Sequence, residues 1–269
     1  MPTSRLLLTR FNVRIGEFRN PKATEVGWLT NRMNLFKEVT VTSILRQRVQ
    51  PDRWFVFFDV ETPETTRQQL AELTGKVPIL SPIFCKRCGP ETYLRVVDEY
   101  LPASTDWIIS TRIDNDDALH PNTLATVYES AEMGRREFIN PTRGLVVANG
   151  KAYRKRDYSS PFISLSESRT EFATVWQGKH HQLNRHGSIR QIPSRDSWIQ
   201  VIHGDNIANQ VRGVRASPST IDPDTLPPYL AKQLLDDGLL SLGLDNSIGL
   251  AGRYSRSALR RAKRMLIGR

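Results

Sequence analysis

Apolar runs typical of buried strands alternate with segments of helical periodicity over the first half of the chain. The pattern predicts strands over residues 4–13, 53–59, 77–80 and 106–111, and helices over residues 28–49, 63–74, 91–101 and 120–133. A helix after each strand is typical of a parallel sheet with helices on both faces. We therefore predict an α/β fold in which ligands bind beyond the carboxyl ends of the strands.

The second half of the chain departs from this alternation. Residues 138–165 alternate apolar and polar side chains as antiparallel strands do, with a hairpin turn over 148–151, and one further strand is predicted over 198–206. Prolines predict a loop over 216–228, and a short helix is predicted over 229–245. The predicted units are a main domain with two halves, a loop with a short helix, and a tail: 1–215 (1–117 and 118–215), 216–252 and 253–269.

Positive charge is concentrated at the C-terminus. The formal net charge is +10, and residues 253–269 contain seven Lys and Arg residues and no acid. Apolar residues at helical spacing predict an amphipathic helix over 254–267, which would suit an anionic membrane surface; a docked helix or a basic tail without fixed structure fits the same pattern. Because the rest of the chain is nearly neutral, we expect no nucleic-acid partner.

No apolar stretch approaches the roughly 20 residues that span a bilayer. The N-terminal apolar run is short and flanked by arginines, so it predicts a first strand rather than a signal peptide. We therefore expect a cytoplasmic protein, peripheral on the inner face of the membrane if its tail binds there.

An acidic cluster, Asp114-Asn115-Asp116-Asp117, directly follows the strand predicted over 106–111. Carboxylates this close repel one another unless a cation lies among them, and two of them suit a hard divalent cation. An EF-hand loop starting at Asp114 would need Gly at its sixth position and Glu at its twelfth, and the chain has neither. Asp59 ends another predicted strand, so it shares the expected ligand edge. A metal site and an acidic turn both remain open on this pattern, with Asn115 as a spacer.

Cys85 and Cys88 form a CxxC motif without a second pair to complete a zinc site. Two reduced thiols are the favoured interpretation, and a redox or disulfide role stays open.

Four segments carry a resemblance to a known family. They are LLTRFNVR at the first predicted strand, WFVFFD at the second, TRIDNDDAL around the acidic cluster, and WIQVIHGDN near residue 200. In this order, over roughly residues 4–210, the chain resembles glycosyltransferases of the GT-A fold, in particular the bacterial rhamnosyltransferase family. The resemblance implies a GT-A-like, Rossmann-like mixed sheet that is mainly parallel, with 1–117 as the nucleotide-binding half and 118–215 as the acceptor-side half.

The resemblance also implies an activity. A sugar, with rhamnose as the one suggested, would pass from a dTDP-, UDP- or GDP-sugar donor to a glycan or lipid-linked acceptor in surface polysaccharide synthesis. Mn²⁺ or Mg²⁺ would offset the charge that grows on the leaving nucleoside diphosphate.

Particular residues take roles from the matching motifs. The metal ligands would be Asp116, with Asp114 or Asp117, completed by His203, although a lone His is more often a core or surface residue. The residues at or near the donor nucleotide would be Thr9, Arg10, Phe11, Asp59 and Arg112; for Arg112 a structural ion pair is an equal alternative.

The catalytic base is predicted among acids that follow the cluster. An inverting transferase needs a carboxylate to take the proton of the acceptor hydroxyl, whereas a retaining one does not. Asp196 is favoured because it closely precedes the strand that carries His203, with Glu167 and Glu171 as further candidates. Each of the three acids could instead be a solvated surface residue.

Two other function classes are considered. A metal-dependent phosphohydrolase could use the same carboxylates, but enzymes of the aspartyl-phosphate type place them after the first strand. A non-catalytic protein that binds membrane or nucleic acid through its basic tail would leave the acidic cluster unexplained.

Overall fold

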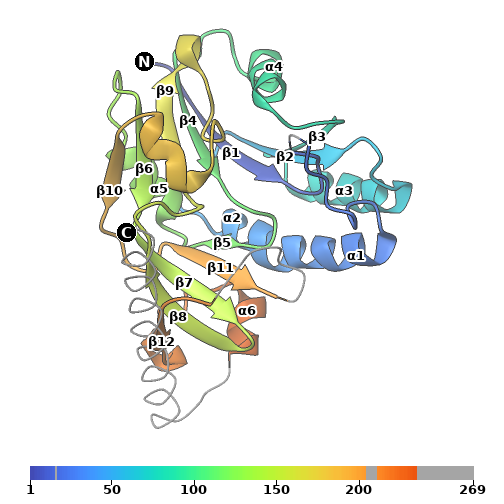
Figure 1. Cartoon of the computed structure of the whole chain (residues 1–269), viewed down its shortest axis with the longest axis vertical. Helices are drawn as coiled ribbons and strands as arrows, with labels where there is room; N and C mark the ends of the chain where they lie inside the picture. The colour runs from blue at the N-terminus through green and yellow to red at the C-terminus, as the bar shows by residue number, and fades with distance from the viewer. Residues whose placement is uncertain (16, 204–210, 235–269) are drawn as a thin grey trace, which may run out of the picture.

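A seven-stranded sheet forms the upper part of the computed structural model, which describes residues 1–15, 17–203 and 211–234 (Figure 1). Its strand order is β10-β6-β9-β4-β1-β2-β3. The strands are β1 (Thr3–Arg10), β2 (Arg53–Asp59), β3 (Leu80–Cys85), β4 (Trp107–Arg112), β6 (Glu137–Pro141), β9 (Ser164–Ser168) and β10 (Ile189–Ile192). The four strands β4, β1, β2 and β3 are parallel to one another, and β9 runs antiparallel between β4 and β6. The predicted α/β fold, with a mixed, mainly parallel sheet flanked by helices, is confirmed.

The parallel strands β1, β2 and β4 each contain a run of at least three buried apolar residues, because helices cover both faces of the sheet. Side chains of β1 alternate, so Leu7 packs with one core and Leu8 with the other. The first core contains buried residues of α1 (Val26–Leu35), α3 (Glu64–Lys76) and α5 (Thr123–Ser130). The second core contains those of α4 (Pro90–Tyr100), which lies on the other side of β1–β3 (Figure 1). Because β4, β1, β2 and β3 are parallel, their carboxyl ends lie at one common edge of the sheet.

The helix predicted over 28–49 is one continuous run of helix with an irregular centre. It consists of α1, a π-helical turn η1 (Phe36–Val41) and α2 (Thr42–Leu45). The run ends four residues before the predicted limit.

A five-stranded sheet, ordered β12-β8-β7-β11-β5, forms the second layer. Its strands are β5 (Ala118–Leu119), β7 (Arg143–Ala148), β8 (Lys151–Arg156), β11 (Trp198–Ile202) and β12 (Val214–Ala216). The predicted hairpin turn is present between β7 and β8, where Asn149 and Gly150 have φ of 49° and 70°, the left-handed conformation that two-residue hairpin turns require. At Gly144 of β7 a Cβ atom would lie 2.1 Å from Cδ2 of Trp198, so glycine permits the close pairing of β7 and β11.

The chain beyond residue 215 continues the same fold. The predicted boundary at 215 falls inside β12, which pairs with β8. A 3₁₀ turn η4 (Pro218–Thr220) and the short helix α6 (Pro228–Gln233) follow, and Leu230 of α6 is buried in the core of the five-stranded sheet. The rest of the helix predicted over 229–245 and the tail 253–269 lie outside the described residues.

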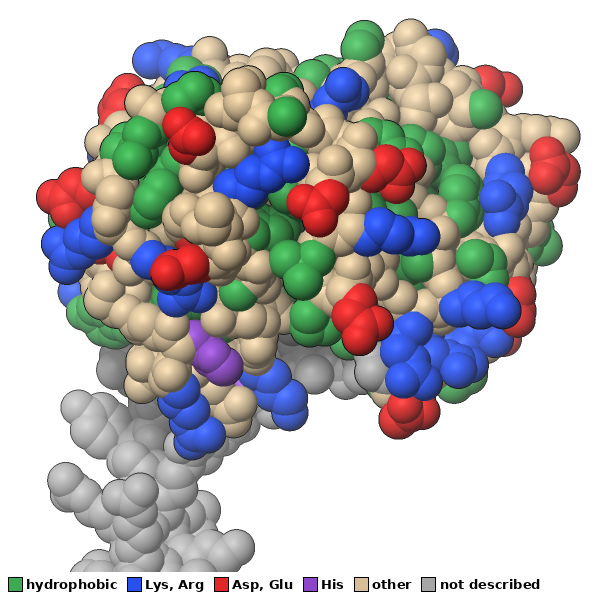
Figure 2. Space-filling model, turned by 90° about the horizontal axis from the view of Figure 1, so that it is seen from above, with side chains coloured by type: hydrophobic (Ala, Val, Ile, Leu, Met, Phe, Trp, Pro, Cys, Tyr) green, Lys and Arg blue, Asp and Glu red, His purple; other side chains and the backbone are tan. Residues whose placement is uncertain are grey.

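Charged side chains of both signs are interspersed over the face that Figure 2 shows from above. Within the described ranges, no helix combines the length and the apolar character that crossing a bilayer would require.

Candidate active site

Asp116 lies at the centre of a polar cluster built from three parts of the chain. Its Oδ2 accepts a hydrogen bond from Arg32 Nη1 of α1 at 2.5 Å and lies 3.0 Å from Nε2 of His203, which directly follows β11. Arg32 Nη1 and His203 Nε2 are 3.3 Å apart. The predicted meeting of Asp116 with His203 is therefore observed, and Arg32 joins them.

The Asp116 carboxylate carries its charge in a buried place. Only 6% of the residue is exposed, and burial by itself would raise its pKa. The hydrogen bond with His203 and the positive charge of Arg32 outweigh burial and hold the pKa of Asp116 below its ordinary value. The guanidinium of Arg32 thus supplies a compensating positive charge at the place where the sequence led us to expect a metal cation.

Asn115 and Asp117, on either side of Asp116, hold the acidic loop in place through hydrogen bonds to two different strands or strand ends. Asn115 donates from Nδ2 to the carbonyl of Phe11 at 2.8 Å, which ties the loop to the end of β1. Asp117 accepts the backbone N–H of Val201 at 2.8 Å, which ties it to β11. Burial and the charge of Asp116 raise the pKa of Asp117 well above its ordinary value. Asn115 is therefore an anchor rather than a spacer, and one oxygen of Asp117 holds the loop in place.

The donor set fits a divalent cation with two protein ligands. Within the described part of the chain, no group of three or more His, Cys, Asp or Glu residues is placed to hold a metal. Asp114 is turned to Arg112, whose Nη2 is 4.0 Å from its Oδ1, and its side chain is 48% exposed. Two ligands of one metal, each bound at about 2.0–2.2 Å, lie roughly 3 Å apart, so Asp116 Oδ2 and His203 Nε2 could both reach one cation if the Arg32 guanidinium, which contacts the same two atoms, moved aside. Mg²⁺ is commonly held by one or two carboxylates and keeps waters or phosphate oxygens at its other positions, so a cation at Asp116 and His203 would need such oxygens to complete its coordination.

Two residues predicted at the nucleotide pocket face the protein core. Thr9 is fully buried, and its hydroxyl accepts a hydrogen bond from Trp54 Nε1 at 2.9 Å. Phe11 is 6% exposed and stacks on Phe58 with ring centroids 4.7 Å apart. Their side chains support the edge of the sheet instead of bordering a ligand.

Asp59 does end its strand at the predicted edge, where it is enclosed by partners. Its Oδ2 is 3.3 Å from Arg19 Nε, and its Oδ1 accepts the backbone N–H of Glu61 at 2.9 Å. The assignment of Asp59 to the nucleobase or ribose stays a prediction. Arg10 and Arg112 also reach this edge, on the side of the sheet that α4 covers.

Asp196 lies at the wrong end of β11 for a base beside Asp116. It precedes the strand and His203 follows it, and seven steps of extended chain span roughly 20 Å. Arg154 binds the Asp196 carboxylate, with Nη2 3.3 Å from Oδ2. At such a separation its carboxylate cannot take a proton from a hydroxyl that reacts at Asp116.

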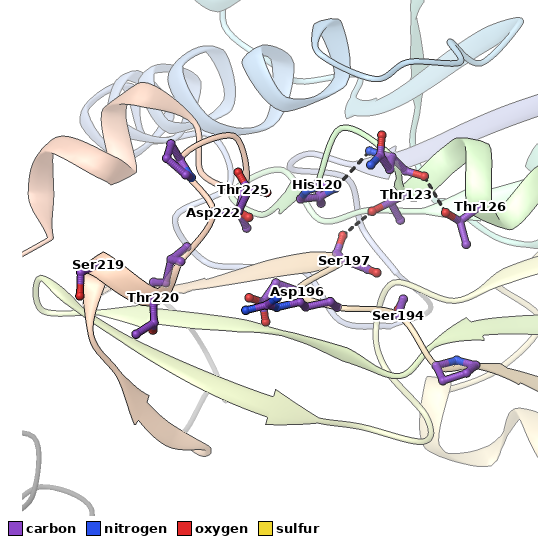
Figure 3. Close-up of a pocket in the computed structure, with 15 residues that line it drawn as sticks. His120, Thr123, Thr126, Ser194, Asp196, Ser197, Ser219, Thr220, Asp222 and Thr225 are labelled. Carbon is purple, nitrogen blue, oxygen red and sulfur yellow. Dashed lines mark hydrogen bonds between the residues drawn. The ribbon is translucent and has the colours of Figure 1, made fainter.

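A polar cavity of about 680 Å³ surrounds Asp196 (Figure 3). It is lined by the start of α5, the loop before β11, and the segment that contains η4. In Figure 3 Ser197 lies beside Thr123, whose hydroxyl donates to the Ser197 carbonyl at 2.6 Å. The cavity therefore lies at the amino end of β11, separate from the cluster at Asp116.

Glu167 is also remote from Asp116. It pairs with Ile108 near the amino end of β4, whereas the acidic loop follows the carboxyl end. Its carboxylate is buried and accepts the backbone N–H groups of Ala173 and Thr174 at 3.1 and 2.9 Å. Glu167 is a structural acid that binds the segment following β9, and the alternative candidate Glu171 is exposed in η2 (Arg169–Glu171).

Sequence reasoning missed Arg32 because it considered only the apolar positions of its helix. A usable signal was present in the spacing: Trp28 and Arg32 are four residues apart on α1, which places them on one face. The Arg32 Cζ atom lies 5.1 Å from the centroid of the Trp28 ring.

Comparisons with known proteins identify one family. The sequence profile of a family described as "Putative rhamnosyl transferase" matches residues 14–215. No curated protein matches the chain. Among solved structures, S. aureus TarS 1–349 in complex with UDP is 13% identical with a TM-score of 0.45, covering 75% of this chain and 61% of that one. S. aureus TarS 1–349 in complex with UDP-GlcNAc is 12% identical with a TM-score of 0.45, covering 81% of this chain and 62% of that one. The chain thus spans about three fifths of the length of these TarS structures.

Proposed function

The chain belongs to the family described as "Putative rhamnosyl transferase". From this premise we propose that it is a glycosyltransferase, which transfers a sugar from a nucleotide-sugar donor with the help of a divalent cation at Asp116 and His203. The observation that carries the proposal is the 3.0 Å approach of these two side chains at the ligand edge of the sheet. Rhamnose is the proposed sugar, on the strength of family membership.

Mn²⁺ or Mg²⁺, when bound, would offset the charge of the leaving diphosphate as a Lewis acid. Asp116 and His203 would hold the cation, while Asn115 and Asp117 keep the loop fixed between β1 and β11. Arg32 presents a second positive charge at the same point, and a guanidinium forms strong paired hydrogen bonds with phosphate oxygens. Arg32 is therefore proposed to contact the donor diphosphate.

The acceptor is proposed to be a glycan or a lipid-linked glycan. The support is the seven cations of 253–269, each of which contributes on the order of 1 kcal/mol near an anionic membrane surface. Co-sedimentation with anionic vesicles, lost on deletion of 253–269, would support the membrane part of this proposal. Equal binding by the truncated chain would refute it.

Release of nucleoside diphosphate from UDP-, GDP- and dTDP-sugars, with and without Mn²⁺, tests the function. Donor turnover that requires Mn²⁺ and falls at least about a hundredfold in Asp116→Asn would support it. Folded Asp116→Asn protein with unchanged turnover would refute the role of the site. Release of inorganic phosphate in place of nucleoside diphosphate would indicate a phosphohydrolase instead.

A further inference from the structure

The guanidinium groups of Arg10 and Arg112 both lie near the indole ring of Trp176, on the side of the sheet that α4 covers. Arg10 ends β1 and Arg112 ends β4, and both side chains contact the face that carries Tyr93 of α4 and Trp176. The Arg10 Cζ atom lies 3.4 Å from the centroid of the Trp176 ring, and the Arg112 Cζ atom lies 5.5 Å from it. Two positive charges are therefore gathered at the carboxyl edge of adjacent parallel strands.

These charges are poorly compensated within the protein. Among the residues that the structure describes, no Asp or Glu oxygen lies within 4.0 Å of the Arg10 guanidinium, and the partner of Arg112 is Asp114 at 4.0 Å. The Arg112 side chain is only 12% exposed. Burial lowers the pKa of Arg112; Asp114 raises it in part, and the charge of Arg10 lowers it further. A buried cation without a close partner is costly, so its retention points to a ligand.

Hydrogen-bond donors of the cluster are also without acceptors. In the described part of the chain, Nε of Arg112 and Nε1 of Trp176 are buried and have no hydrogen-bond partner. Arg10 is oriented by its Nε, which donates to the hydroxyl of Tyr93 at 2.9 Å. That hydroxyl also lies 3.1 Å from Sγ of Cys88, which donates to it. Arg10 is thus held in place through its Nε.

We propose that Arg10 and Arg112 together bind a phosphate group. A diphosphate carries about two negative charges at neutral pH, as does a terminal phosphate, which matches two guanidiniums, and the phosphate oxygens accept the paired N–H groups of an arginine fork. A neutral sugar hydroxyl would leave the charges uncompensated, and one carboxylate would compensate only half of them. This proposal rests on the proposed function only for the source of the phosphate. That source would be the diphosphate of the donor or a phosphate carried by the acceptor.

The site is distinct from the cluster at Asp116. Arg32 belongs to α1, which packs in the first core, whereas Arg10 and Arg112 face the second core with Tyr93 and Trp176. Asp114, next to Arg112, leads directly into the loop that carries Asp116. A phosphate at Arg10 and Arg112 would therefore lie beside the donor site without using the same ligands.

Calorimetric titration of the full chain with inorganic phosphate and pyrophosphate, in the presence of EDTA, tests the site. We expect binding by the wild type and a loss of affinity of at least about tenfold in Arg10→Met and in Arg112→Met. Arg67→Met is the matched control, because Arg67 also stacks on an aromatic ring, Phe84, at 4.0 Å, but donates to backbone carbonyls. Its affinity should equal that of the wild type.

Thermal unfolding gives a second readout that a merely structural arginine would not produce. Without ligand, Arg112→Met should melt at or above the wild-type temperature, because it removes a poorly paired buried cation. Pyrophosphate should then raise the melting temperature of the wild type but not that of the variant. Wild-type affinity retained in both Met variants, or no binding of either anion by the wild type, would overturn the proposal.

Competition distinguishes the two sources of phosphate. If UDP, GDP or dTDP displaces inorganic phosphate, the site holds the donor diphosphate; if phosphate binds together with the nucleotide, it serves the acceptor. Since the titration contains neither metal nor sugar, absent phosphate binding counts against this site alone. Absent sugar transfer counts against the proposed function alone.

Discussion

Glu167→Gln separates a structural acid from a catalytic one. Glu167 lies in β9 with no exposed surface, and two backbone N–H groups and the Arg136 guanidinium, 3.5 Å away, face its carboxylate. Burial raises the pKa of Glu167 from 4.5 to about 7, although these donors act in the opposite direction. The folded protein therefore binds a proton at this residue at pH values where the unfolded chain has released it.

Because the folded state binds this extra proton, the unfolding free energy decreases as pH rises. Stability associated with Glu167 is fully present below its unfolded pKa of 4.5 and is lost as pH rises through about 7. That interval corresponds to on the order of 3 kcal/mol of unfolding free energy. Glutamine does not titrate, so this loss is absent from the variant. The glutamine amide leaves one backbone N–H without an acceptor, a cost of about 1–3 kcal/mol that does not change with pH.

Urea unfolding followed by tryptophan fluorescence, at pH 5, 6, 7 and 8, measures the effect. The unfolding free energy of Glu167→Gln should rise relative to the wild type by on the order of 3 kcal/mol across this range. Glu171→Gln, at an exposed position, is the control and should follow the wild type. Equal pH slopes for Glu167→Gln and the wild type, or loss of donor turnover in the folded variant, would refute the reasoning.

Three further substitutions test the packing that positions the site. Gly144→Ala should destabilise the chain by about 3 kcal/mol or prevent soluble expression, because the new Cβ would overlap Trp198; a soluble variant with wild-type melting temperature would contradict the close pairing. Asn115→Ala should lower the unfolding free energy in urea by about 1–3 kcal/mol, because the buried Phe11 carbonyl loses its bond; no change would show that the loop is held otherwise. Trp54→Phe should cost about 1–3 kcal/mol in the same assay through loss of the indole bond to β1, and an unchanged midpoint would count against that bond.

Much of the fold could be predicted from local pattern. Continuous apolar runs such as β2 are sufficient to indicate a parallel sheet, because buried strands must be apolar on both faces. The turn at Asn149 and Gly150 has the residue pair that a hairpin needs. The resemblance to GT-A glycosyltransferases, rather than any local pattern, predicted that Asp116 and His203 meet.

Predictions that relied on closeness along the chain were less successful. Asp196 is near His203 in sequence, but an extended strand separates its own two ends, so the two residues lie at opposite ends of β11. Thr9 is next to the ligand edge, yet strand alternation turns its side chain into the core. The spacing of Trp28 and Arg32 places both on one helix face, but it does not show that Arg32 contacts Asp116, which is 84 positions away.

The central claim is that Asp116 and His203 form one binding site for a divalent cation. Calorimetric titration of Mn²⁺ in the presence of saturating nucleoside diphosphate measures it directly, in the wild type, Asp116→Asn, His203→Ala and the control Asp196→Asn, whose acid lies at the other end of β11. We expect Mn²⁺ affinity to fall at least about tenfold in the first two variants and to be unchanged in the control. Equal Mn²⁺ affinity in all four proteins, or no Mn²⁺ binding by the wild type, would contradict the account.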